Sequence, residues 1–246
     1  MRPTALHHTS YSRPITCWHL RPSSIWAIGA LTSFFIFVIG ASLVSAQEAE
    51  AIRPLLTSGV NGLWQTLPKD TRHLTDAASI ENFLKLVDGT PPDWAAVYDH
   101  GNHDERLFTL NRERDRLRER RTQAPPLVTF LWDGELSDYD PRLGGFRLAI
   151  GPQIIATPWG LVRFKPESLP SDLVALPSPQ IRNALQADAA GGRKVEILVA
   201  MTGRLVPEES IIYDFAHDQP GKGMVMPVIR IERLDYLLLE AGRPSR

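Results

Sequence analysis

Apolar residues recur with the spacing of helices in the first part of the chain and with the spacing of strands in the second. Four helices are expected in the first part, over 52–67, 80–87, 94–98 and 102–121. The first of these is amphipathic, but Gly59 and Gly62 weaken it, so it should depend on packing against another surface. Pro125 and Pro126 mark the boundary at which the spacing changes.

After this boundary, apolar and polar residues alternate, as in strands that bury one face. Two long strands are expected, over 128–136 and 195–205, and they share the pattern apolar-x-apolar-x-Gly-charge-Leu. The pattern places Gly134 and Gly203 on the inward face, where the missing side chain lets a strand coil sharply or another backbone approach. If these strands are neighbours, Glu135 and Arg204 should meet on the outer face.

The remaining alternating segments complete a strand-rich domain. Further strands are expected over 146–150, 161–164, 211–215 and 224–237, with a helix over 178–189. This order, in which a helix separates two groups of strands, resembles that of the OB-fold, a small β-barrel. An up-and-down or other small mixed barrel is the alternative. The sequence therefore predicts an α+β protein: a helical region over 47–124, a mostly antiparallel OB-like β-barrel over 125–240, and a disordered tail over 241–246.

An uncharged apolar run from Ile25 to Ala46 precedes the helical region. Arginines come before it, and it ends in Val44-Ser45-Ala46, the small-residue pattern of a signal-peptide cleavage site. About 20 apolar residues suffice to cross a bilayer, so an uncleaved anchor is the alternative to cleavage after Ala46. Residues 1–46 are thus expected to be a signal peptide or an N-terminal membrane anchor. The rest of the chain would be periplasmic, or anchored facing the periplasm, with membrane contact only through 25–46 if this segment is uncleaved.

Charge and cysteine content exclude several classes of function. The first 46 residues hold three of the 27 basic residues and none of the 28 acidic ones, so 24 basic residues remain against 28 acidic ones. This mildly acidic balance argues against a nucleic-acid partner, because phosphate backbones are bound through basic surfaces. The single cysteine, Cys17, lies in the leader, so the exported part has no thiol nucleophile and no cysteine ligand for a metal. No cofactor-binding motif occurs, and no cofactor is expected.

His100, His103 and Asp104 form the most suggestive cluster for chemistry, because imidazole and carboxylate are suitable ligands for zinc or iron. Gly101 separates the two histidines, so they do not stack on one helix face as an i, i+4 pair would. The alternative interpretation places the histidines in an exposed turn and uses Asp104 to complement the helix dipole.

A second acidic cluster, Asp133, Glu135, Asp138 and Asp140, begins on a predicted strand. Alternate strand residues lie about 6.6 to 6.8 Å apart, so Asp133 and Glu135 share a face at a separation not far from that of paired glycosidase carboxylates. The alternative is an outward barrel face that runs into a turn.

The second half of the 102–121 helix is almost entirely charged and is open to two interpretations. It could be a basic patch for anionic lipid or polysaccharide. Alternatively, it is a solvated helix end, in which Asp115 and Glu119 pair with arginines one turn away. Leu107, Phe108 and Leu110 are expected to be buried in the first half of this helix.

Trp132, Tyr139, Trp159 and Tyr213 could form a recognition face on the predicted barrel, or else belong to its core. The favoured hypothesis is an exported, non-catalytic binding or scaffold protein of a bacterial-type envelope, whose envelope protein or glycan partner the sequence does not identify. The rival is a metal-assisted hydrolase that acts on an envelope glycan or ester through His100, His103 and Asp104. A third hypothesis is a membrane-tethered assembly factor whose 52–67 helix packs on a partner.

Overall fold

The computed structural model describes residues 51–99, 101–120, 124–206 and 211–239. The predicted export segment, His100 and the predicted C-terminal tail therefore lie outside the described residues. Within the described ranges, no helix is both long enough and apolar enough to span a membrane.

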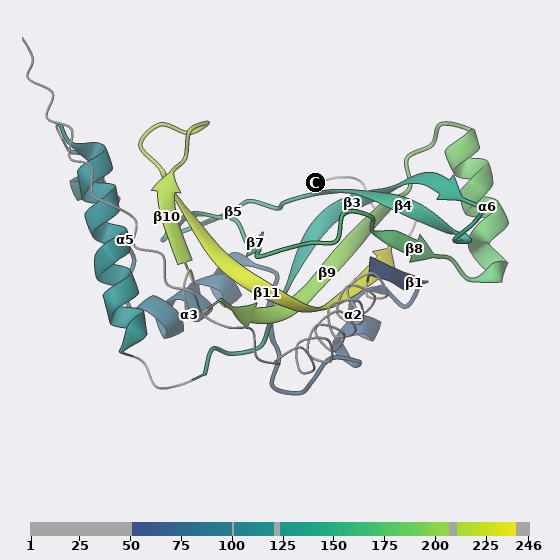
Figure 1. Ribbon diagram of the computed structural model, residues 1–246, viewed down its shortest axis with the longest axis horizontal. Coiled ribbons are helices and arrows are strands. Elements are labelled where there is room, and N and C mark those ends of the chain that lie inside the picture. Colours follow the sequence, from purple (N-terminus) through teal and green to yellow (C-terminus); the bar gives the residue numbers. More distant parts are fainter. Residues whose placement is uncertain (1–50, 100, 121–123, 207–210, 240–246) are drawn as a thin grey trace, which may run out of the picture. The chain divides into compact units, whose positions relative to one another are not determined.

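Six strands close into a mixed β-barrel (Figure 1). In order around the barrel they are β1 (Ile52–Leu56), β8 (Val174–Leu176), β4 (Gly145–Gly151), β3 (Val128–Asp140), β9 (Glu196–Leu205) and β11 (Gly223–Leu238). β1 is parallel to both of its neighbours, β8 and β11. The other neighbouring pairs around the barrel are antiparallel. The barrel prediction is confirmed, with a parallel strand where the sequence indicated a mostly antiparallel sheet.

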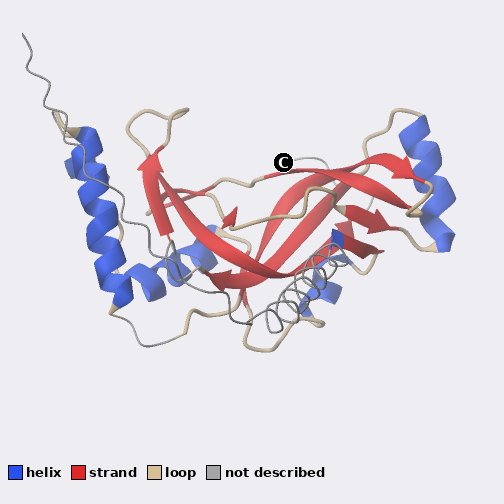
Figure 2. Ribbon diagram, in the orientation of Figure 1, coloured by secondary structure: helices blue, strands red, loops and turns tan. Residues whose placement is uncertain are grey.

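Shorter strands extend the sheet beside the first half of β11 and beside the start of β3 (Figure 2). They are β10 (Ile211–Phe215), β6 (Gly160–Val162) and β7 (Lys165–Pro166) beside β11, β5 (Ile155–Thr157) beside β6, and β2 (Arg72–Leu74) beside β3.

The helices are α2 (Gly59–Trp64), α3 (Ala77–Asp88), α4 (Trp94–Tyr98), α5 (His103–Glu119) and α6 (Pro179–Ala190). Local signals fix several of their ends. Asp76 and Ser79 form a capping box at the start of α3, and Gly89 ends this helix with a φ of 83°. The Asp93 side chain caps α4 by accepting a hydrogen bond from the backbone N–H of Ala96. α3, α4, α5 and α6 match the sequence prediction to within a few residues.

The barrel interior follows the predicted alternation. Val128, Phe130 and Trp132 on β3 are buried together with their partners on β9. Gly203 is required for close packing, because a Cβ atom at this position would overlap the carbonyl oxygen of Arg230 on β11. The predicted close approach of two backbones is therefore confirmed at Gly203.

The predicted helix over 52–67 is wrong in its first part, because residues 52–56 form β1 and only Gly59–Trp64 is helical. The apolar spacing was ambiguous: Leu55 faces the barrel core, and Leu56 packs with α2 in a second apolar cluster on the outer surface. Tertiary pairing with β8 and β11 decides the outcome, since a short segment with β-branched and leucine side chains accepts either structure.

The predicted contact between Glu135 and Arg204 is also wrong. β3 and β9 are neighbours, but they run antiparallel in a register that pairs Glu135 with Glu196 and Val128 with Gly203. The two charged residues therefore lie at opposite ends of the shared ladder. Glu135 instead pairs with Lys194 at 3.0 Å, and Arg204 pairs with Glu232 at 3.3 Å.

Candidate binding groove

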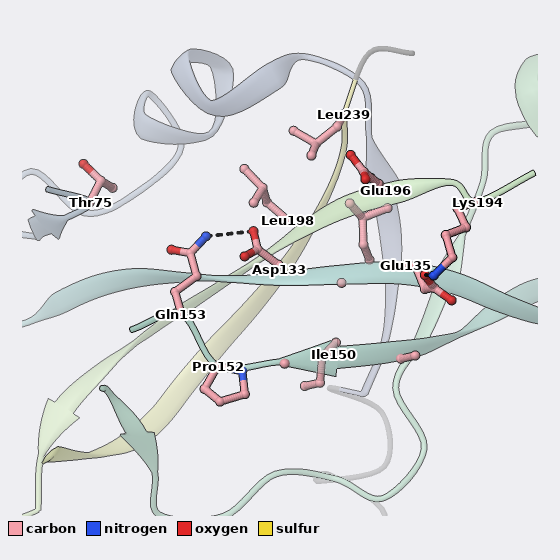
Figure 3. A pocket seen from close by; sticks show the side chains of 14 residues that line it. Thr75, Asp133, Glu135, Ile150, Pro152, Gln153, Lys194, Glu196, Leu198 and Leu239 are labelled. Atoms are coloured by element: carbon pink, nitrogen blue, oxygen red, sulfur yellow. Dashed lines mark hydrogen bonds and ion pairs between the residues drawn. The ribbon is translucent and has the colours of Figure 1, made fainter. Parts of the chain in front are cut away.

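An open groove of about 1300 Å³ lies on the outer face of β3, β4 and β9 (Figure 3). Asp133 and Glu135 project from β3 along its floor, and Glu196 and Leu198 project from β9. Gln153, Lys194 and Leu239 stand around the rim. We call this surface the β3/β9 groove.

The strand register explains why these side chains gather. Asp133 lies between Gly151 on β4 and Leu198 on β9, and the next outward row contains Ala149, Glu135 and Glu196. Alternation with a period of two sends both rows to the same face of the sheet.

The groove is hollow because the β4 positions in these rows carry small residues. A Cβ atom added to Gly151 would meet no atom within 4 Å, so the space beside Asp133 is open. Ala149 leaves similar room beside Glu135. The carboxylates are therefore flanked by space on the β4 side and by β9 side chains on the other.

Helix α2 defines where the groove begins. Leu63 and Leu67 cover the outer face at Ala200 and Leu237, and Leu198 is the partly buried edge of this apolar cluster. Beyond Leu198 the outer face carries Asp133, Glu135 and Glu196, which line the β3/β9 groove.

The acidic side chains of the groove have few partners. Gln153 donates a hydrogen bond of 2.8 Å to Asp133, and the Lys194 ammonium lies 3.0 Å from Glu135. Within the described part of the chain, the Glu196 side chain makes no hydrogen bond or ion pair. It faces Glu135 directly across the ladder, an arrangement of like charges that costs free energy in a sheet.

The predicted metal cluster is only partly visible. His103 begins α5, where its Nδ1 lies 3.4 Å from the carbonyl oxygen of Val97 and its ring packs near Tyr98 and Phe215. Asp104 lies in the first turn of the same helix. Among the residues that the structure describes, no three histidine, cysteine or carboxylate side chains are grouped so that they could hold a metal ion. Because His100 is outside these residues, the cluster stays a prediction.

The proposed aromatic recognition face is wrong for three of its four residues. Trp159 and Tyr213 are 0% and 1% exposed, and Trp132 is 8% exposed, so all three belong to the core. Tyr139 is half-buried against Phe146, with ring centroids 5.1 Å apart. Trp132 and Tyr213 occupy inward positions of β3 and β10, whereas Trp159 lies in the turn between β5 and β6 and is buried there.

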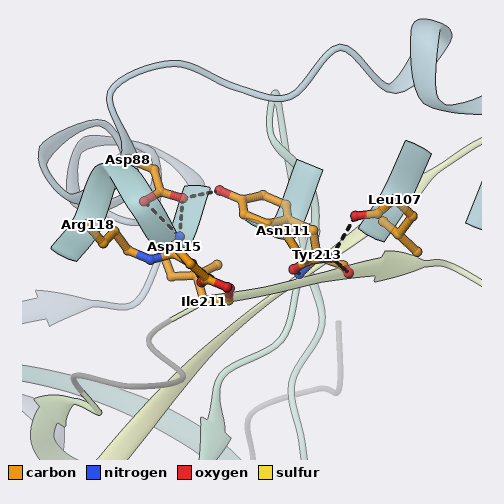
Figure 4. Close-up of polar contacts among 7 residues, drawn as sticks. All are labelled: Asp88, Leu107, Asn111, Asp115, Arg118, Ile211 and Tyr213. Atoms are coloured by element: carbon orange, nitrogen blue, oxygen red, sulfur yellow. Dashed lines mark hydrogen bonds and ion pairs between the residues drawn. The ribbon is translucent and has the colours of Figure 1, made fainter. Parts of the chain in front are cut away.

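A buried polar cluster joins α3, α5 and β10 at a site distinct from the groove (Figure 4). The Asp88 carboxylate, which is 0% exposed, accepts hydrogen bonds of 2.9 and 2.7 Å from the Arg118 guanidinium and another from the Tyr213 hydroxyl. Arg114 donates to the Asp88 carbonyl oxygen at 2.8 Å. Burial, and then the adjacent Asp88 carboxylate, raise the pKa of Tyr213 well above its usual range. The hydroxyl therefore stays protonated and serves as a donor.

This cluster limits the predicted solvated helix end to one face of α5, on which Arg112, Glu113, Arg116 and Glu119 are exposed. Arg114 is buried and the Arg118 side chain is 7% exposed, although Asp115 does pair with Arg118 at 2.5 Å as expected. In the first half of the helix, Phe108 is 63% exposed rather than buried.

Asn111 adds a further link between α5 and β10. Its side-chain amide donates to the Tyr213 carbonyl oxygen at 2.8 Å and accepts from the Tyr213 N–H at 2.9 Å (Figure 4). The side chain thus pairs with the backbone of β10 as another strand would, and it covers part of an exposed sheet edge.

Neither the β3/β9 groove nor the buried polar cluster was identified in full from the sequence. The sequence did place Asp133 and Glu135 on one strand face, but Glu196 joins them only through the β3–β9 register. A signal for the buried cluster was present, since Arg114 and Arg118 are one turn apart and continue the face of Leu107 and Leu110 on α5.

Comparisons of this chain with protein-family models, with curated proteins and with solved structures found no match.

Proposed function

We propose that this chain is an exported, non-catalytic binding or scaffold protein of a bacterial-type envelope, and that the β3/β9 groove is its binding surface. The observation that carries the proposal is the uncovered groove of about 1300 Å³, in which carboxylates and leucines face open space. Concave surfaces with a few placed polar groups are where proteins bind ligands. The leader pattern at Ile25 to Ala46 supports the assignment to an exported protein.

We further propose that the barrel is OB-like, with one added strand. β3, β4 and β8 precede α6, and β9 and β11 follow it, which is the element order of an OB-fold. β1 stands between β8 and β11, at the place where the third and last strands of such a barrel would otherwise meet. OB-folds support binding functions of many kinds, and this likeness favours binding without naming a ligand.

Site-specific photo-crosslinking in intact cells of the native host tests the binding function. A photoreactive amino acid at Leu198, in the groove, should give a discrete crosslinked adduct in the envelope fraction. The same amino acid at Phe108, which is 63% exposed on α5, is the matched control and should give none. Identical adduct patterns from the two positions, or recovery of the protein only from the cytoplasm, would contradict the proposal.

The hydrolase hypothesis has a separate test. Native mass spectrometry of the purified protein before and after addition of zinc, manganese or iron reports metal binding directly. A stoichiometric adduct that His103→Ala abolishes would favour the hydrolase over the binding protein.

A further inference from the structure

We propose that the ligand of the β3/β9 groove is an extended basic peptide segment with cationic residues at alternate positions. This inference rests on the proposed binding function and names the class of partner.

The first argument is charge complementarity. Asp133, Glu135 and Glu196 contribute three carboxylates, and Lys194 is the only basic side chain that lines the groove within the described residues. Lys194 is already paired with Glu135, and Asp133 receives only the neutral amide of Gln153. The groove therefore holds an excess of two negative charges, and a cationic partner would relieve the direct opposition of Glu135 and Glu196.

The second argument concerns spacing and separates a peptide from a metal ion. The three carboxylates lie on two strands and do not converge, and no grouping suited to a metal occurs in the described part of the chain. Asp133 and Glu135 are alternate residues of one strand, about 6.6 to 6.8 Å apart. Alternate side chains of an extended peptide have the same separation, so two cationic side chains can meet these two carboxylates at once.

The third argument is the shape of the surface. The groove exceeds the volume of typical small-molecule pockets, which hold about 300 to 1000 Å³. Leu198 and Leu239 provide apolar surface on which the aliphatic stems of lysine or arginine can lie.

The strands also constrain how the peptide binds. β3 and β9 are paired on both sides along the groove, whereas β4 pairs there with β3 and meets β8 only at Phe146 and Arg147. The peptide therefore cannot add beside β3 or β9, and on these strands it must be recognised through side chains, with its cationic residues directed at the sheet.

Fluorescence anisotropy with a labelled peptide Arg-Ser-Arg-Ser-Arg-Ser-Arg tests this inference on the full chain. Two comparison peptides keep the length: one has glutamate in place of arginine, and one has the same composition with all arginines contiguous. The alternating basic peptide should bind more tightly than both. Spermine serves as a competitor that carries charge without a peptide backbone.

Variants of the groove and of a remote surface provide the matched controls. The double variant Asp133→Asn/Glu196→Gln should weaken binding about tenfold, or about 1.4 kcal/mol over two exposed contacts. The double variant Asp138→Asn/Glu113→Gln removes the same charge from exposed positions that do not line the groove, and it should change binding less than about twofold. Gly151→Leu fills open space without altering charge and should also weaken binding.

Equal losses in the two double variants would overturn the inference, because they would show attraction by net charge alone. Absence of binding, tighter binding of the contiguous peptide, or displacement by spermine at an equal concentration of charge would overturn it as well. A crosslinked adduct at Leu198 combined with no binding of the basic peptide would reject the peptide while leaving the binding function in place.

Discussion

Replacing Asp88 by asparagine should destabilise the protein strongly, because this residue holds the buried cluster between α3, α5 and β10 together. Asparagine has nearly the same shape as aspartate, so the change removes charge without opening a cavity. It leaves the Arg118 guanidinium, whose side chain is 7% exposed, without its buried counterion. It also replaces the charged acceptor of the Tyr213 hydroxyl with a neutral one.

The structure sets the size of the effect. Breaking a buried ion pair by removing one partner costs about 3 to 5 kcal/mol. Arg118 would keep Asp115, whose side chain is 43% exposed, and the carbonyl oxygen of Ile211 at 3.1 Å. Because these partners remain, the free energy of unfolding should fall by about 3 kcal/mol, which is the lower limit of that range. Tyr213→Phe removes one hydrogen bond to a charged group and should cost about 1.5 to 3 kcal/mol.

Equilibrium urea unfolding, followed by tryptophan fluorescence, measures both losses. The matched control is Glu81→Gln, which breaks the 2.7 Å surface pair with Lys85 and should cost less than about 1 kcal/mol. If Asp88→Asn is no more destabilising than this control, the carboxylate does not hold the cluster, and the argument from burial is refuted.

Three further changes probe other parts of the fold. Gly203→Ala should lower the free energy of unfolding by about 1 to 3 kcal/mol, because the added Cβ would overlap the Arg230 carbonyl oxygen. Gly151→Ala is the control and should change this free energy by less than about 0.5 kcal/mol. Comparable losses in the two variants would contradict the close approach at Gly203. Asn111→Ala should expose the edge of β10, so hydrogen exchange at the Tyr213 amide should accelerate, while unchanged protection would show that this side chain does not cover the strand. A hydrogen bond from the backbone N–H of Ser79 holds the pKa of Asp76 below its usual range. The contribution of this cap to the stability of the fold is therefore present above a pH of about 3.9, the ordinary pKa of aspartate. It is lost as the pH falls through the lower pKa of the folded state. Asp76→Asn should remove this pH dependence in an NMR titration of α3, and its persistence would assign it to another group.

Local patterns predicted most elements because they depend on neighbours in sequence. Alternation identified the two long strands, and Asp93 and Gly89 marked helix ends through caps that are visible in the sequence. The same local signals failed at 52–56, where pairing with strands more than a hundred residues away decides the structure.

The candidate site was harder to predict because it depends on register. The sequence placed Asp133 and Glu135 on one face but could not supply the opposing residue, which is Glu196 rather than the expected Arg204. Nor can the sequence decide between a recognition face and the core for its aromatic residues, and only the closed barrel shows that Trp159 and Tyr213 are buried.

The parallel strand β1 has a consequence for the time at which the barrel can form. Leu55 and Leu56 pair with Tyr236 and Leu237, so the first and last strands of the described chain must meet before the barrel closes. Such contacts between distant parts of a sequence slow folding. During synthesis, the barrel therefore stays incomplete until Tyr236 and Leu237 have left the ribosome. This delay would keep the chain unfolded long enough to suit a protein that we propose to be exported.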